Sequence, residues 1–209
     1  MEIKIVDYTK VIKKNTILNN INFTFESGKI YGLHGRNGSG KTMLMRAIAG
    51  LILPTKGYVS IDDKVIGKDM DFPESCGVLI ENMNLIQENS GLDNLKLLAK
   101  IKKKITVDEI KNVMCDLGLD PNSKKSIRTY SLGMKQKLNI AQAIMEKPTL
   151  LLLDEPTNAL DEKSVSKVKD ILIEARNQGA LIIIASHNKE DLLFLSDEII
   201  EIENGRIVN

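Results

Sequence analysis

An eight-residue segment near the start of the sequence has the residue types of a phosphate-binding loop. It reads Gly35-Arg36-Asn37-Gly38-Ser39-Gly40-Lys41-Thr42 and fits the pattern G-x-x-x-x-G-K-[ST]. A strand predicted over Ile30–Leu33 precedes it and a helix predicted over Met43–Leu51 follows. Glycines let backbone amides wrap around phosphates, and a helix start adds unpaired N–H donors. We expect Asn37, Gly38, Ser39, Gly40, Lys41 and Thr42 to bind a nucleotide, with Thr42 also holding Mg²⁺. A glycine-rich turn without a ligand is the weaker alternative, because a strand and a helix flank the loop.

Two adjacent carboxylates follow a second apolar stretch, Leu150–Leu153. This stretch is apolar on both parities, as a strand buried on both faces should be. Ligands of open α/β sheets bind at the carboxyl ends of strands, where Asp154 and Glu155 would lie. We expect Asp154 to hold Mg²⁺ and Glu155 to polarise an attacking water. The alternative makes Glu155 an acidic N-cap of the next helix, and the phosphate loop upstream favours the catalytic role.

The elements that must position these groups indicate a parallel-sheet α/β core with a mostly helical insertion. Further strands are predicted around Ile3 and Ile5, over 17–25, at Tyr58–Ile61 and at Leu181–Ala185, with a helix over Glu162–Gln178 and a hairpin at Asn204-Gly205. Between about 82 and 147 helical spacing dominates, and Thr106-Val107-Asp108-Glu109 has the form of a capping box. The run Lys102-Lys103-Lys104 is most simply a solvated linker.

Composition excludes several classes of protein. The 209 residues carry 29 Lys and Arg against 28 Asp and Glu, and this near-balance argues against a protein that coats nucleic acid. Two cysteines without a CxxC spacing make a zinc site or disulfide framework improbable and favour a reducing compartment. No apolar run approaches the roughly 20 residues that span a bilayer, and no signal peptide is evident.

The order of motifs resembles the nucleotide-binding domain of ATP-binding cassette (ABC) transporters. Tyr130-Ser131-Leu132-Gly133-Met134, 23 residues before Asp154, is similar to the family signature usually written LSGGQ. Asn158-Ala159-Leu160-Asp161 resembles the D-loop, and Ser186-His187 resembles the switch histidine. The resemblance implies an α/β fold: a P-loop NTPase (RecA-like) core with an antiparallel β subdomain. It covers the chain as one domain, with core residues 1–81 and 148–209 and a helical subdomain of about 82–147.

The resemblance also implies a mechanism and partners. Two such domains would dimerise head to tail around two ATP molecules, each held by one phosphate loop and by Ser131 and Gly133 of the other chain. His187 would contact the γ-phosphate. Separate transmembrane permease subunits would hold the domain at the cytoplasmic face of the membrane, with Leu85, Ile86 and Leu92 as candidate exposed contacts. No nucleic-acid partner is expected.

Two positions differ from the usual family pattern, and one of them indicates a subgroup of the family. Glu81 stands where most relatives have the Q-loop glutamine, so we expect it near Mg²⁺ and the attacking water, unless it is a drifted Gln. Together with the YSLGM signature, Glu81 resembles the bacitracin-resistance and lantibiotic-immunity subgroup, whose members export peptide antibiotics. The position of the adenine-stacking aromatic aligns with Ile12, with Tyr8 nearby but out of register.

Three functional readings follow. The first is the ATPase subunit of an exporter of peptide antibiotic or another amphiphilic compound. The second is a non-transport ABC ATPase associated with translation or DNA. The third is a nucleotide-binding module that does not turn over, which Glu155 and His187 argue against. The transported substrate, the permease and the choice between a homodimer and a heterodimer are not encoded in recognisable motifs.

Overall fold

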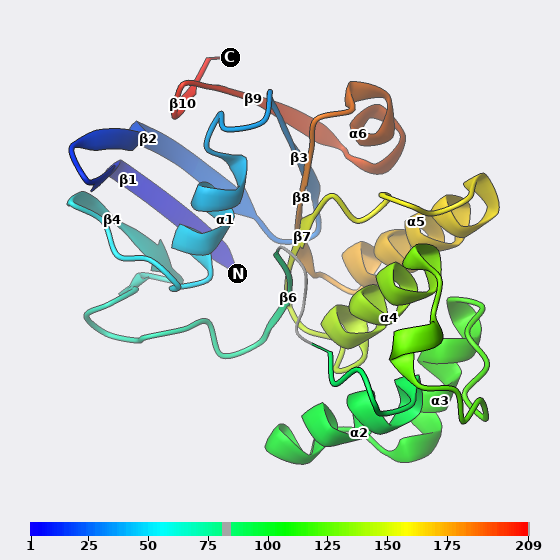
Figure 1. Ribbon diagram of the computed structural model, residues 1–209. Helices are drawn as coiled ribbons and strands as arrows, with labels where there is room; N and C mark the ends of the chain where they lie inside the picture. Colours follow the sequence, from blue (N-terminus) through cyan, green and yellow to red (C-terminus); the bar gives the residue numbers. More distant parts are fainter. Residues whose placement is uncertain (81–84, 209) are drawn as a thin grey trace.

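The computed structural model describes residues 1–80 and 85–208, and two sheets organise them (Figure 1). In this part of the chain the smaller sheet is antiparallel, in the order β2-β1-β4-β5. Its strands are β1 (Glu2–Ile12), β2 (Asn15–Glu26), β4 (Lys56–Ile61) and β5 (Lys64–Val65). This sheet is the predicted antiparallel β subdomain.

The larger sheet has the order β10-β9-β3-β8-β7-β6. Its strands are β3 (Ile30–His34), β6 (Cys76–Leu79), β7 (Leu150–Asp154), β8 (Leu181–Ser186), β9 (Glu198–Glu203) and β10 (Arg206–Ile207). Neighbouring strands from β9 to β6 are parallel, whereas β10 pairs antiparallel with β9 through the predicted Asn204-Gly205 hairpin. The parallel sheet and its helices confirm the predicted P-loop NTPase core.

Helices cover both faces of the larger sheet. They are α1 (Lys41–Ile48), α2 (Gly91–Lys102), α3 (Val107–Asp116), α4 (Leu132–Ile144), α5 (Glu162–Asn177) and α6 (Lys189–Leu195), with a 3₁₀ turn, η1, at Ile127–Thr129. Figure 1 shows α1 between the two sheets, and α2, α3 and α4 gathered on the side away from β1. Among the described residues no helix is both long enough and apolar enough to cross a bilayer.

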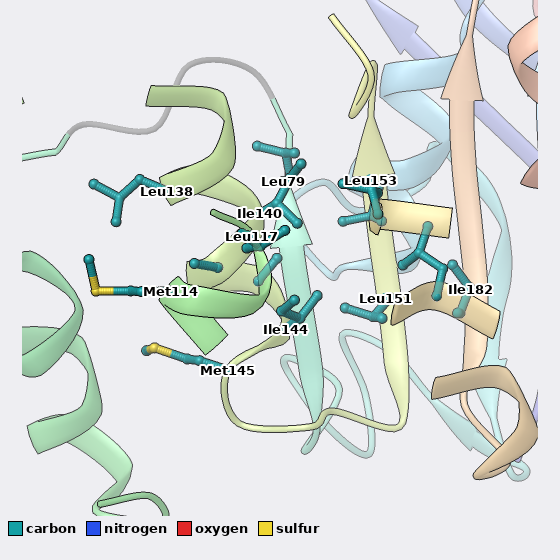
Figure 2. Packing of buried hydrophobic residues seen from close by; sticks show 14 of the residues in the cluster. Leu79, Met114, Leu117, Leu138, Ile140, Ile144, Met145, Leu151, Leu153 and Ile182 are labelled. Atoms are coloured by element: carbon teal, nitrogen blue, oxygen red, sulfur yellow. The ribbon is translucent and has the colours of Figure 1, made fainter. Parts of the chain in front are cut away.

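The side chains of β7 alternate between two hydrophobic clusters. Leu151 and Leu153 belong to the cluster under α3, α4 and α5, and Leu150 and Leu152 belong to the cluster under α1 and the antiparallel sheet. Figure 2 shows the first cluster, where Leu151 and Leu153 lie with Ile182 beside residues of the helical side. Because successive strand residues point to opposite faces, a sheet covered on both sides needs apolar residues at every position. This explains the continuous apolar run of the strand.

The first helix differs from its predicted bounds of Met43–Leu51. It begins at Lys41, since Gly40 in the left-handed region starts it, and it ends at Ile48. The amide of Gly50 donates to Ala47 O and that of Leu51 to Arg46 O, the bonds that close a helix at a glycine. Lys41 and Thr42 are therefore helical residues rather than loop residues.

The helical region contains the predicted capping box and a second cap that was not predicted. Thr106 and Glu109 form a reciprocal capping box at the start of α3, and Ser90 caps α2. Of the three apolar residues expected to be exposed, only Ile86 is; Leu85 and Leu92 pack partly buried against the helical core. The prediction was wrong for these two because both pack against that core, Leu92 from α2 and Leu85 from the segment before it.

Candidate functional site

Three neighbouring strands bring the predicted catalytic segments to one edge of the sheet. β8 lies between β3 and β7, and all three are parallel. The phosphate loop follows β3, Asp154 ends β7, and His187 follows β8. Residues more than 100 positions apart in the sequence therefore meet, as ligand sites of parallel sheets require.

The phosphate loop is built to receive an anion. Gly40 has φ +115° and provides no side-chain cap, so the N-terminal amides of α1 keep their donors for another acceptor. The hydroxyl of Ser39 is buried and has no hydrogen-bond partner among the described residues. A buried hydroxyl without a partner is costly, and a phosphate oxygen would satisfy it.

Lys41 is held inside the loop. Its Nζ donates to Gly35 O at 2.6 Å and to Arg36 O at 3.2 Å. Burial lowers the pKa of Lys41, and the charges of Glu155 and Asp154 oppose that effect. A buried ammonium held at the base of the phosphate loop would be stabilised by the negative charge of a bound phosphate chain.

Thr42 and Asp154 form the candidate cation site. The Thr42 hydroxyl donates to Asp154 Oδ2 at 2.6 Å, which joins the start of α1 to the end of β7. Within residues 1–80 and 85–208 no three His, Cys, Asp or Glu side chains gather closely enough to hold a metal ion. One hydroxyl and one carboxylate suit Mg²⁺, which usually takes one or two carboxylates together with substrate phosphates.

Glu155 is bound by the residues that end β8. Its Oε1 accepts from the His187 amide at 2.9 Å and lies 2.7 Å from His187 Nδ1, while Oε2 accepts from Ser186 Oγ at 3.0 Å. An ionised carboxylate only accepts, so His187 Nδ1 carries a proton and donates it to Glu155, and Nε2 faces away from this bond. The N-cap alternative is wrong, because Asp161 caps α5 through Ser164 N.

The site opens into a pocket beside the hairpin of the antiparallel sheet. This pocket has a volume of about 520 Å³ and is lined by Ile12, Lys13, Asn15, Ile17, the segment 37–43, Asp154 and Glu155. Ile12 thus lines the pocket that contains the phosphate loop, and its contact with the base stays a prediction. Tyr8 is fully buried and its hydroxyl donates to Ile52 O, so Tyr8 belongs to the core and not to the pocket.

The signature residues lie outside this pocket. Ser131 caps α4 by accepting from Met134 N, and neither Ser131 nor Gly133 is among the residues that line the described pocket. Leu132 between them is 71% exposed. A Cβ on Gly133 would lie 2.7 Å from Ala159 O, so the signature turn is packed against the D-loop. Glu81 lies outside the described residues.

Several residues of the site were missed by the sequence analysis. Lys13 lines the pocket, as do Asn15 and Ile17, and Ser186 was noted only as the neighbour of His187. Gln136 on α4 donates to Glu155 O at 3.0 Å and to Pro156 O at 3.1 Å. The Lys13-Lys14 pair at the hairpin signals the first contact, whereas no local pattern predicts the one made by Gln136.

The comparisons with known proteins agree with this geometry. Residues 18–158 match the family model described as ABC transporter. The uncharacterized ABC transporter ATP-binding protein YybJ of Bacillus subtilis (strain 168) is 52% identical, over 98% of this chain and 94% of that protein. The bacitracin transport ATP-binding protein BcrA of Enterococcus faecalis is 36% identical, over 96% of this chain and 66% of that protein.

A solved structure shows the same fold. The dimeric structure of MJ0796, titled a bacterial ABC transporter cassette, superposes with a TM-score of 0.88, at 24% identity, over 99% of this chain and 97% of that chain. The relatives support the expected resemblance to the bacitracin-resistance and lantibiotic-immunity subgroup. The chain belongs to the ABC transporter family, as an ATP-binding domain of the ABC ATPase kind.

Proposed function

We propose that this chain hydrolyses ATP at the strand-end site and that the energy drives export of a peptide antibiotic or another amphiphilic compound. One observation supports hydrolysis above simple binding. The Thr42–Asp154 pair and the Glu155–His187 pair lie together beside the phosphate loop. A binding module needs the loop alone, whereas a second carboxylate oriented by a histidine suits the activation of water.

Each residue then has a separate task. The amides of residues 37–40 and the ammonium of Lys41 bind the phosphates, and Thr42 and Asp154 hold Mg²⁺, which neutralises phosphate charge when bound. Glu155 polarises the attacking water, and His187 orients Glu155 through Nδ1. A phosphate oxygen accepts, so the proposed contact of His187 with the γ-phosphate requires a proton on Nε2 as well, as in the imidazolium form. Ile12 contacts the base. Glu81 stays a prediction, with its role near the metal and the water.

Two copies of the chain would complete the sites. Ser131 and Gly133 lie outside the pocket of their own chain and stand next to the exposed Leu132, so they suit a nucleotide bound by another copy. The related cassette MJ0796 was solved as a dimer. We propose a head-to-tail homodimer with two ATP molecules between the chains, in which Ser131 and the start of α4 bind the partner's γ-phosphate.

A transmembrane permease would be the second partner and would hold the chain at the cytoplasmic face of the membrane. The name of the similar bacitracin transport protein supports a transport function with a peptide antibiotic as substrate, and export is the direction that we propose. We propose residues 1–209 as one ATPase domain, with a core of 1–81 and 148–209 and the permease docked on the helical subdomain of about 82–147. Of the three apolar residues expected at this contact, Ile86 is the exposed one, and we assign it to the permease interface.

Replacing Glu155 tests hydrolysis. Glu155→Gln keeps size and hydrogen bonding but removes the charge, so turnover should fall by roughly 10²–10⁴-fold while ATP binding persists. The variant should then accumulate as an ATP-bound dimer, which size-exclusion chromatography would detect. Glu162→Gln, an exposed change in the first turn of α5, is the matched control and should leave turnover unchanged. Near-normal turnover of Glu155→Gln would remove Glu155 from the catalytic role.

Transport requires a separate test. We expect a multi-span membrane protein to be encoded beside this chain, and co-expression of the two should yield a complex that purifies together and lowers bacitracin susceptibility. Ile86→Asp should weaken that complex, and Leu193→Asp, an exposed position on α6, should not. Co-purification with ribosomes or DNA in place of a membrane protein would favour the non-transport alternative.

A further inference from the structure

Gln136 of α4 connects two parts of the molecule that the proposed mechanism assigns to different nucleotides. Its Nε2 donates to Glu155 O at 3.0 Å and to Pro156 O at 3.1 Å. One amide group thus binds two consecutive carbonyls of the segment that carries the catalytic carboxylate. α4 begins at Ser131, five residues earlier, with the signature turn.

The backbone of Glu155 needs such support. Its φ is +48°, in the left-handed region that residues other than glycine seldom adopt. The amide of Glu155 donates to Ala185 O at 2.8 Å, so its N–H is bound by β8 and its carbonyl by Gln136. Backbone in this region persists only where its surroundings determine it. Without Gln136, the carbonyl side of Glu155 loses its contact with α4.

A second contact joins the same two segments. Ala159, four residues after Glu155, has φ +63°, and its carbonyl lies against Gly133, where a Cβ would come within 2.7 Å. The segment 155–159 is therefore held against the first two turns of α4 at both of its ends. Movement of the signature turn would be passed to Glu155 through these contacts.

We propose that Gln136 is a positioning residue that aims Glu155 at the water and links the two ATP sites of the dimer. This proposal rests on the proposed head-to-tail arrangement. In that arrangement Ser131 and Gly133 contact the nucleotide bound by the partner chain, whereas Glu155 acts on the nucleotide of its own chain. Through the hydrogen bonds of Gln136, binding of ATP at the partner's site changes the position of Glu155 at the chain's own site.

The test compares steady-state hydrolysis and nucleotide binding of the full chain and its variants. Gln136→Ala should lower kcat by about tenfold to a hundredfold, the scale of a displacement of roughly 1 Å at a reacting group, with KM within about twofold. The link predicts a Hill coefficient for ATP above one in the wild type and a value nearer one in Gln136→Ala; a wild-type value of one would overturn the link. Gln136→Lys, which keeps a donor of similar reach, should recover part of kcat. Gln178→Ala, at a residue that caps α5 and whose side-chain amide donates to Glu174 of that helix, should match the wild type in every measurement.

The outcomes separate the two proposals. A wild-type chain without hydrolysis overturns the proposed function and the role of Gln136 with it. An active wild type with an equally active Gln136→Ala variant overturns the role of Gln136 alone. A lower kcat with an unchanged Hill coefficient overturns the link between the sites. A rise of KM and of the ATP Kd together, measured by titration calorimetry, would show a structural defect and also overturn the proposal.

Discussion

Replacement of Ile12 by tyrosine tests how this chain binds the base of its nucleotide. Ile12 ends β1 at the pocket, and its side chain is 39% exposed. None of the described residues that line this pocket is aromatic. Tyr8, the nearest aromatic in the sequence, is buried in the core. The phosphate loop and Mg²⁺ do not read the base, so affinity should come from the phosphates.

The magnitude follows from stacking. Stacking of a base on an aromatic side chain contributes about 1–3 kcal/mol and tolerates any base. Ile12→Tyr should therefore tighten ATP and GTP together by roughly 5- to 150-fold, because each 1.4 kcal/mol is tenfold. The exposed position at a strand end has room for the ring, and tyrosine suits a strand.

Titration calorimetry with ATP and GTP measures this effect. Val11→Tyr is the matched control: Val11 is also exposed but adjacent in the strand, so its side chain points to the opposite face. Equal gains in both variants, or no gain for Ile12→Tyr, would refute the assignment of Ile12. A wild-type preference for ATP above about 100-fold, near 2.7 kcal/mol, would require an adenine reader elsewhere, such as a residue of the second chain.

Three further predictions concern the core, the thiols and the Q-loop position. Leu151→Ala, at a side chain 1% exposed between β7 and the helices, should cost about 2–5 kcal/mol of unfolding free energy in a urea titration, against at most about 0.5 kcal/mol for Leu193→Ala at an exposed site; similar costs would contradict the packing. Burial raises the pKa of Cys76 to about 12, so at pH 8 only about one in 10⁴ of its thiols is ionised; Ellman's reagent should label the exposed Cys115 in native protein and both thiols after denaturation, and fast labelling of Cys115→Ser would contradict this. Glu81→Gln should change the hydrolysis rate or its Mg²⁺ dependence, and Glu81→Ala should also weaken coupling to the permease; indistinguishable titrations would mark Glu81 as incidental.

Much of the fold could be predicted because its signals are local or periodic. The apolar runs at Leu150–Leu153 and Leu181–Ala185 are buried strands, and the capping box at Thr106 starts α3. The bounds of α1 were less accurate, because the helix begins inside the phosphate loop and ends at Gly50. The predicted exposure of Leu85 and Leu92 was wrong because burial depends on which side chains pack against a core, and that core is built by elements distant in the sequence.

The sequence by itself determined the chemistry available to this protein: a loop for phosphates, two carboxylates after a buried strand and a histidine after another. Motif order and spacing were enough to identify the family, since these groups work only at the ends of adjacent strands. Tertiary structure decided which groups touch. Strand order brought His187 to Glu155, the packing of α4 brought Gln136 to the same residue, and the hairpin brought Ile12 to the loop. The Gln136–Glu155 contact joins residues 19 positions apart, and the His187–Glu155 contact joins residues 32 positions apart. No local pattern encodes such contacts, because they arise only when separate elements share one core.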